Sequence, residues 1–358
     1  MNEIEYEQAV KRSLCSKGNN YRLKKKLEEK KKDLNVAFSG GSISRGSNGK
    51  CVLEENYTEL VCRALAERFP ERNIINTNLS ADSADSFIGL SIADKMISEV
   101  RPDIVFVEYA VNNDVDMEHI ISFESLVSRY YNSESKPAVI LILLINQSFY
   151  TSQGYMKMVG KQYGLPLISV ADSLKKLLED NVIDWQTYSD DTIHPNEWGF
   201  KFIADSIMYY FDTVKNDPKD EEIIKVNPVY SLDYENFKAV SADSSEIEHK
   251  GYASAKGTDF FEHSLSLKEK NDGSYIKFKS KFRFLFTAYL HDKTDRFSDA
   301  EIYIDGEKKC VLQGMSVYGW GNAVLKNVYR SEREKEHEVR IKVKDPSKEF
   351  VFLEFGIC

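Results

Sequence analysis

Four side chains in three short stretches of the chain could act together in one reaction. Ser42 follows two glycines in VAFSGGSISRG, Asn112 lies in AVNND, and Asp191 and His194 lie in DDTIHPN. A serine hydroxyl is a weak nucleophile until a base takes its proton, and histidine is the side chain best suited to that task near neutral pH. These residue types therefore predict attack by Ser42 on a carbonyl carbon, with His194 as the base.

The spacing of the acid and the base supports this hypothesis. An imidazole needs an acceptor on its second nitrogen, and a carboxylate three residues earlier can reach it within one tight turn. We therefore expect Asp191 to orient His194, with Asp190 as the alternative. We also expect Pro195 to begin the next helix, because proline is favourable at the first helical position.

Attack on an ester would create an oxyanion, which requires fixed hydrogen-bond donors. The candidates are the N–H group of Ser42, the N–H group of Ala81 and the side-chain amide of Asn112. Ser80 competes with Ala81 for the second role, and Asn113 competes with Asn112 for the third, because two asparagines adjoin in AVNND. The spacing from EYAV favours Asn112.

Each motif taken alone has an ordinary structural interpretation. A single Asp-x-x-His is more often a surface turn with a helix-capping aspartate, and a single asparagine is more often a turn residue. The combination changes this judgement, because all the motifs lie in order beside predicted strand ends. We therefore interpret them as parts of one site.

The elements that must position these residues show a regular alternation. From residue 34 to residue 213, short apolar runs alternate with segments of helical period, which is typical of βαβ units. This pattern predicts a three-layer α/β/α domain with a five-stranded parallel sheet, whose carboxyl ends are the usual place for a ligand. The predicted strands are residues 34–39, 73–78, 103–111, 138–145 and 166–170. We expect residues 1–33 to form an N-terminal helical extension.

The character of the chain changes after this domain. Residues 214–228 are polar and contain two prolines, which indicates a linker. Beyond them the hydrophobic period becomes two, and Asp305-Gly306 is a hairpin signal. We therefore predict a small all-β sandwich, jelly-roll-like, and place the domains at residues 1–217 and 218–358.

Composition limits the function further. The chain has 358 residues and a net charge of −9, which argues against nucleic acid as a partner. The longest apolar run, residues 138–145, is too short to cross a membrane, and the start of the chain does not resemble an export signal, so we expect a cytoplasmic protein. The five cysteines and six histidines show no metal-binding spacing, so we expect no metal or cofactor. The oligomeric state is left open.

Taken together, these motifs resemble those of the SGNH or GDSL hydrolase superfamily, over roughly residues 35–210. The resemblance implies Ser42 as the nucleophile, Asp191 and His194 as the acid and base, and Ser42, Ala81 and Asn112 as oxyanion donors. The chain departs from the family pattern where Ala81 replaces a glycine, where VNND replaces VND, and where Ser44 replaces a common threonine.

Subfamilies with GGSIT and EFAVND are most similar to this chain, and they include carbohydrate O-acetylesterases that carry a β-sandwich domain. The resemblance thus implies a serine esterase that removes O-acyl groups, above all O-acetyl groups, from carbohydrates through an acyl-enzyme. The expected partner is an acetylated oligosaccharide or another small ester. The alternatives are a lipid or small-ester hydrolase, a sugar O-acyltransferase with the same triad, and a non-catalytic carbohydrate-binding protein.

Two further features have competing interpretations. Tyr318 and Trp320 lie in SVYGWGNAV and could stack on sugar rings, although a tryptophan in the core or at a domain interface is the slightly stronger interpretation. Glu108 in FVEYAV could be a buried partner of the site, and a structural hydrogen bond is an equal alternative.

Overall fold

The structure divides the chain into two compact units. It is a computed structural model that describes residues 1–29, 32–258, 260–269 and 273–358. The first unit is Met1–Leu232 and the second is Asp233–Cys358. Residues 30 and 31 of the predicted N-terminal extension lie outside the described residues. Within the described residues, the helices include none with the length and apolarity needed to span a bilayer.

The first unit is built on a sheet in which six strands are described, in the order β1-β6-β5-β4-β2-β3. The predicted parallel strands are present, and all pair in parallel. The sheet is nevertheless mixed, because the short strand β1 pairs antiparallel with β6 and was not predicted. The strands are β1 (Leu14–Ser16), β2 (Asp33–Gly40), β3 (Asn73–Asn78), β4 (Ile104–Glu108), β5 (Ala138–Leu143) and β6 (Leu167–Ser169).

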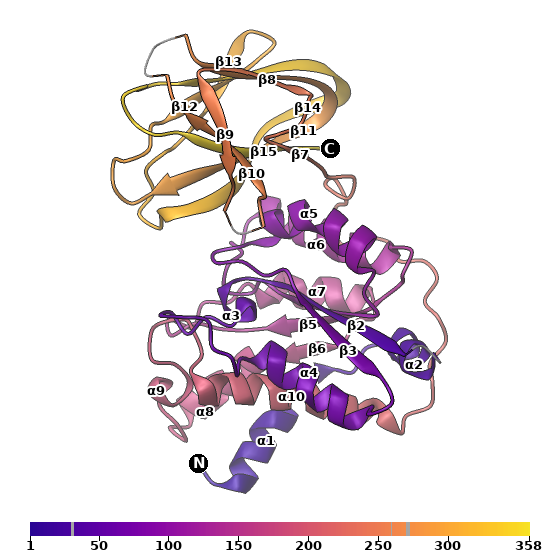
Figure 1. Cartoon of the computed structure of the whole chain (residues 1–358). Helices are drawn as coiled ribbons and strands as arrows, with labels where there is room; N and C mark the ends of the chain where they lie inside the picture. Colours follow the sequence, from indigo (N-terminus) through magenta and orange to yellow (C-terminus); the bar gives the residue numbers. More distant parts are fainter. Residues whose placement is uncertain (30–31, 259, 270–272) are drawn as a thin grey trace. The chain divides into compact units, whose positions relative to one another are not determined.

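Helices cover both faces of this sheet, as Figure 1 shows, with α5, α6 and α7 on one face and α4, α8 and α10 on the other. These helices are α4 (Tyr57–Arg68), α5 (Ser86–Lys95), α6 (Met117–Asn132), α7 (Gln153–Gln162), α8 (Val170–Glu179) and α10 (Glu197–Lys215). The remaining helical segments are α1 (Glu3–Ser13), α2 (Tyr21–Glu28), α3 (Ser42–Arg45), the π-helical turn η1 (Met96–Val100) and α9 (Trp185–Tyr188). This is the predicted three-layer arrangement.

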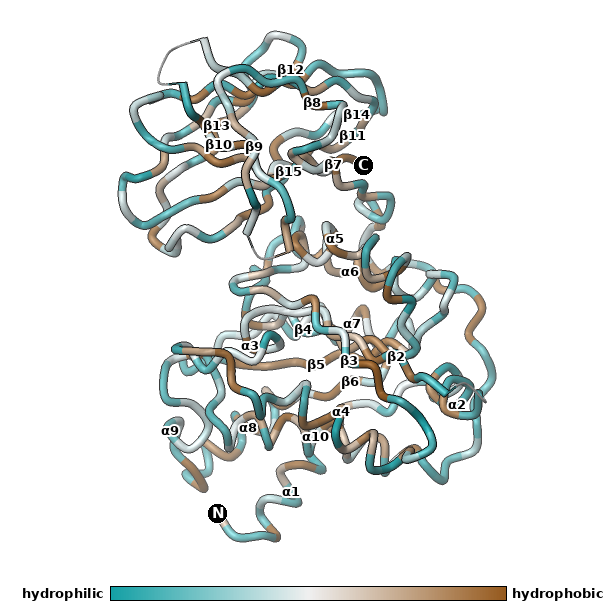
Figure 2. Tube along the Cα trace, viewed as in Figure 1, coloured by the Kyte–Doolittle hydropathy of each residue, from teal (hydrophilic) through white to brown (hydrophobic). Residues whose placement is uncertain are grey.

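The central strands are apolar because both of their faces are covered. Every residue of β5, with sequence AVILIL, is buried, and Figure 2 shows this strand as a hydrophobic stretch. In β4, Ile104 and Phe106 join the core beneath α4 and α10. The sequence signal for these strands was strong for this reason, since a strand that is buried on both faces is mostly apolar.

The helix α10 begins later than predicted. Asn196 is its N-cap, and the Asn196 side chain accepts a hydrogen bond from the Gly199 N–H. Pro195 therefore precedes the cap and does not occupy the first helical position. The side-chain cap fixes the start of the helix because it satisfies an N–H group that lacks an intrahelical partner.

The boundary between the units lies after the segment that we expected to be a linker. The buried Glu124 carboxylate accepts hydrogen bonds from the N–H groups of Val229 (2.6 Å), Tyr230 (2.7 Å) and Ser231 (3.2 Å). Asn20 and Asp220 are joined by two further hydrogen bonds. These contacts hold the segment on the first unit, and the boundary falls at 232/233 instead of 217/218.

In the second unit, the described strands form one antiparallel sheet in the order β13-β12-β14-β11-β15-β10-β9, with β7 on β15 and β8 on β11. A single core of apolar side chains lies between its parts. Asp305 and Gly306 form the predicted two-residue hairpin between β12 and β13, with φ of 53° and 82°. The strands are β7 (Lys238–Ser241), β8 (Ile247–Lys250), β9 (Tyr252–Lys256), β10 (His263–Leu267), β11 (Tyr275–Asp292), β12 (Ala300–Ile304), β13 (Glu307–Leu312), β14 (Trp320–Val343) and β15 (Val351–Ile357).

Candidate active site

Three side chains that lie far apart in the sequence form a continuous line of hydrogen bonds. The Ser42 Oγ atom lies 2.9 Å from His194 Nε2. The other ring nitrogen, His194 Nδ1, lies 2.7 Å from Asp191 Oδ2. With a proton on Nδ1, the Nε2 atom is an acceptor for the serine hydroxyl. The arrangement can therefore remove a proton from Ser42 and hold the resulting imidazolium against a carboxylate.

The Asp191 carboxylate is fixed by its own turn. Its Oδ1 atom accepts hydrogen bonds from the N–H groups of Ile193 and His194, both at 2.6 Å. Burial raises the pKa of Asp191, but these N–H groups and the His194 ring lower it more, so that the pKa lies below its usual value. The carboxylate is therefore ionised at neutral pH. Asp190, the alternative acid, is exposed and accepts instead from the Asn196 side chain at 3.3 Å.

The turn that carries Asp191 and His194 is closed by Ser189. The Ser189 hydroxyl lies 2.6 Å from the His194 carbonyl oxygen and 2.9 Å from the Asp191 carbonyl oxygen. The Trp185 indole N–H also donates to the Asp191 carbonyl oxygen, at 2.6 Å. These contacts hold the acid and the base at fixed positions on a loop, because the carbonyl groups of both residues are hydrogen-bonded.

Ser42 begins the short helix α3 directly after β2, and two glycines make room for it. A Cβ atom on Gly41 would lie 2.4 Å from Asn112 Oδ1, and one on Gly40 would lie 2.7 Å from the Glu108 carbonyl oxygen. Neither glycine has a positive φ. The two glycines are therefore needed because neighbouring groups approach their Cα atoms closely. Neither glycine adopts a backbone angle that a residue with a side chain would avoid.

The two adjoining asparagines have different environments. Asn113 is fully buried, and its side chain bonds to the Ser86 N–H, the Ser86 hydroxyl and the Tyr155 hydroxyl, at 2.7–2.9 Å. The Asn113 side chain therefore stabilises the start of α5. Asn112 lies against Gly41, and its Oδ1 atom is buried without a hydrogen-bond partner. Of the two, only Asn112 has a side chain at the serine turn.

The N–H group of Ala81 already has an acceptor. It donates to the Gly40 carbonyl oxygen at 3.3 Å. The competing residue, Ser80, donates its N–H to the Asn78 side chain at 3.0 Å. The structure thus places Ala81 beside the strand that leads to Ser42, but its N–H group points to the backbone of that strand.

Gly49 is a site residue that the sequence did not reveal. A Cβ atom at Gly49 would lie 2.1 Å from Asp191 Oδ2 and 3.1 Å from His194 Nδ1, the two atoms that share a hydrogen bond. The φ of Gly49 is +84°, a backbone angle that residues other than glycine rarely adopt. The backbone at this position therefore lies directly against the acid and base, and any side chain would displace them.

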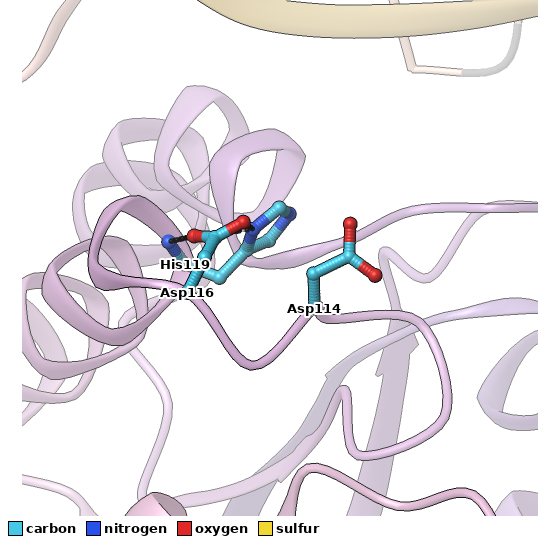
Figure 3. Close-up of side chains that lie close together, drawn as sticks. All are labelled: Asp114, Asp116 and His119. Carbon is cyan, nitrogen blue, oxygen red and sulfur yellow. Dashed lines mark hydrogen bonds and ion pairs between the residues drawn. The ribbon is translucent and has the colours of Figure 1, made fainter.

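A second Asp-x-x-His pair lies beside the Asn112 loop. Figure 3 shows Asp114, Asp116 and His119, whose potential ligand atoms lie within 4.8 Å of one another. His119 Nδ1 lies 3.0 Å from Asp116 Oδ2, and His119 Nε2 lies 3.5 Å from Asp85 Oδ2. Asp116 caps α6 and Asp85 caps α5. The imidazole therefore joins the starts of two helices.

The charge of His119 follows from these neighbours. Burial lowers its pKa, but the carboxylates of Asp85 and Asp116 raise it more, to about 9. At neutral pH the ring is protonated and forms ion pairs with both carboxylates. We interpret the cluster as an ion-paired clamp.

The two aromatic residues singled out in the second unit are exposed. Tyr318 is 82% exposed and Trp320 is 54% exposed. Trp320 begins β14 and donates its N–H to the Asn322 side chain at 3.0 Å. Neither ring belongs to the core of the unit, which excludes the core interpretation of Trp320.

Comparisons with known proteins agree with the fold. No model of a known protein family matches the chain, and no curated protein matches it. A solved two-domain esterase (CEX) active on acetylated mannans is similar over 97% of both chains, with a TM-score of 0.88 and 23% identity. A structure of such an esterase co-crystallised with mannopentaose gives a TM-score of 0.86 with the same identity and coverage. At this identity the likeness confirms the predicted fold, an α/β domain followed by an all-β domain.

Gly49→Ala tests the close contact with the acid–base pair, with Gly306→Ala as the matched control. Gly306 has a similar φ of +82°, but a Cβ there would meet nothing within 4 Å. We expect the control to cost about 1–2 kcal/mol of backbone strain, and Gly49→Ala to cost about 2 kcal/mol more. Chemical denaturation measures both. The downfield NMR signal of the His194 Nδ1 proton should also be lost in Gly49→Ala only; equal costs and an unchanged signal would contradict the contact.

His119→Gln tests the clamp through its pH dependence. The raised pKa means that the contribution of His119 to stability is fully present below pH 6.5 and is lost as the pH rises through about 9. The difference in unfolding free energy between wild type and His119→Gln should therefore be largest near pH 6 and decrease by about 1–3 kcal/mol by pH 10. Denaturant titrations at several pH values measure this difference. A constant difference would show that the charge of His119 contributes nothing.

Proposed function

We propose that the protein is a serine esterase that hydrolyses O-acetyl esters on carbohydrates, with Ser42 as the nucleophile. The observation that carries this proposal is the line of contacts from Ser42 through His194 to Asp191. Such a line activates a hydroxyl group, and a scaffold or binding protein has no need of it. The fold likeness to an esterase active on acetylated mannans supports a mannan-type oligosaccharide as the substrate.

In the first half of the reaction, Ser42 Oγ attacks the acetyl carbonyl carbon while His194 Nε2 takes the hydroxyl proton. The carbonyl oxygen becomes an oxyanion. Collapse of this intermediate expels the sugar oxygen, which takes the proton from His194, and leaves an acetyl group on Ser42. Asp191 remains ionised throughout and stabilises the imidazolium.

The second half repeats these steps with water. His194 takes a proton from a water molecule as the water oxygen attacks the acetyl carbon. The second oxyanion collapses, Ser42 leaves with the proton from His194, and acetate is released. One base thus serves both halves, because it returns its proton in each.

The oxyanion needs donors beside Ser42. We assign this role to the Ser42 N–H at the start of α3 and to the side-chain amide of Asn112, which lies against Gly41. The N–H of Ala81 can contribute only if it exchanges the Gly40 carbonyl oxygen for the oxyanion. Asn112 is therefore the donor whose removal is most informative.

Acetate release from a small aryl acetate and from acetylated mannooligosaccharides tests the function. Ser42→Ala should abolish turnover of both. Asn112→Ala should lower kcat by about 10²–10³ with little change in KM, because the donor acts mainly on the transition state. Asp191→Ala should lower kcat strongly, whereas the adjacent Asp190→Ala is the matched control and should retain activity.

The outcomes separate the alternatives. Turnover that survives Ser42→Ala would overturn the mechanism. A preference for long-chain esters would indicate a lipase, transfer of acetate to an added sugar would indicate an acyltransferase, and glycan binding without turnover of any ester would indicate a binding protein.

We further propose that Tyr318 and Trp320 contribute to glycan binding, because their exposed rings can stack on sugars. Replacing either by alanine should raise KM for acetylated mannooligosaccharides several-fold and leave KM for the aryl acetate unchanged. Val317→Ala is the control, since Val317 is 77% exposed in the same loop but has no ring. Equal KM values in wild type and both aromatic variants would remove this role.

A further inference from the structure

A buried carboxyl group lies behind the serine turn and has no part in the steps above. Glu108 is the last residue of β4 and is 1% exposed. Its Oε2 atom accepts a hydrogen bond from the Ser44 hydroxyl at 3.0 Å. Ser44 belongs to the same short helix as Ser42 and is fully buried. Glu108 thus touches the turn that carries Ser42 without touching the reacting atoms.

The hydrogen bonds around Ser44 have a defined direction. The Ser44 hydroxyl lies 2.6 Å from the Tyr57 hydroxyl. A serine hydroxyl has one proton, so when Ser44 donates to Glu108 it must accept from Tyr57. The resulting chain runs from Tyr57 through Ser44 to Glu108. The last group in this chain of hydrogen bonds, Glu108, is an acceptor. The ionised carboxylate is the form of Glu108 that only accepts hydrogen bonds.

Burial opposes this ionised form. It raises the pKa of Glu108 to about 7, although the Ser44 hydroxyl and the N–H groups of Gly41 and Ala110 partly lower it. The groups that face Glu108 are therefore donors, and Gly41 adjoins Ser42. The Glu108 Oε1 atom is buried without a hydrogen-bond partner, so a proton on Glu108 would change the pattern of donors and acceptors in this pocket.

The other titratable groups that face Glu108 are tyrosines. Tyr57 comes from α4, Tyr188 from α9, and Tyr109 follows β4. Burial raises the pKa of each of them well above its usual value. They stay neutral across the physiological range, and the described residues include no ion pair to Glu108. Among these four groups, Glu108 alone changes its charge within the physiological range.

We infer that Glu108 is a positioning residue, whose ionised carboxylate holds the serine turn in its reactive geometry through Ser44. This inference rests on the proposed function. Protonation of Glu108 would weaken the hold on α3 and lower the reactivity of Ser42. The reactivity should then require two groups without protons, the His194 ring and the Glu108 carboxyl, and not His194 alone.

The rate at which a fluorophosphonate labels Ser42 tests the inference independently of any ester substrate. Ser42 Oγ displaces fluoride from phosphorus, and its proton passes to His194. Mass spectrometry of the intact, full-length protein follows the labelling from pH 5 to pH 9. In wild type, the logarithm of the rate should rise with a slope of more than one, up to about two per pH unit, over the interval in which both groups lose their protons. In Glu108→Gln the slope should fall to about one, with a rate at pH 8 reduced about 10–100-fold.

Ser44 variants provide a second measurement, which also serves if Glu108→Gln does not fold. The Ser44 hydroxyl lowers the pKa of Glu108, so Ser44→Ala should raise that pKa and move the acid limb of the profile to higher pH. Ser44→Thr keeps the hydroxyl and should leave the acid limb where it is in wild type.

The possible results are distinct. A Glu108→Gln protein with the wild-type rate and slope would overturn the inference, and so would an acid limb that Ser44→Ala does not move. A wild-type protein that is labelled at Ser42 but releases acetate from no ester would refute only the proposed substrate class. A wild-type protein that is not labelled would refute the proposed function itself, and the inference with it.

Discussion

The hydrogen bond between Ser42 and His194 is the constraint on which the site depends. It joins residues 152 positions apart, and a change of about 1 Å at either end would break it. On the serine side, β2 and β4 run in parallel, which brings Ser42 and the Asn112 loop to the same edge of the sheet. The loop of Asp191 and His194 is then fixed by contacts within itself, chiefly those of Ser189. The sheet and the internal hydrogen bonds of this loop together fix the distance between Ser42 Oγ and His194 Nε2.

Close packing of the backbone supports the same geometry. Gly40, Gly41 and Gly49 each lie where a side chain would strike a neighbouring polar group, and two of these groups are Asn112 and Asp191. The site is thus surrounded by backbone at van der Waals distance, which leaves its polar side chains little freedom to choose other rotamers. Behind it, the carboxyl group of Glu108 and the hydroxyl groups of Ser44 and Tyr57 form a buried polar layer. Such layers are rigid when every member is satisfied and are sensitive to a change of charge when one is titratable.

Much of the fold could be predicted from the sequence, because strands buried on both faces leave long apolar runs and helices begin with capping side chains. The short strand β1 could not be predicted, since three residues carry no period. The site shows the limit more sharply: Asp116 and His119 have the same spacing as Asp191 and His194, but the first pair caps and joins helices. The second pair differs because Ser42, which lies far away in the sequence, contacts His194, and only the tertiary structure reveals this contact. The role of Gly49 was also hidden, because it depends on contacts with a loop far along the chain.

The order of strands in the second unit has a consequence for biosynthesis. The strand β15, at residues 351–357, lies between β11 and β10 in the interior of the sheet. On the ribosome, this sheet therefore stays open along its middle until residue 357 has emerged, whereas all the described strands of the first unit precede residue 170. The first unit can fold while the second still exposes unpaired strand edges, which are the surfaces most prone to aggregation. Nascent chains stalled shortly before β15 would thus be clients for chaperones.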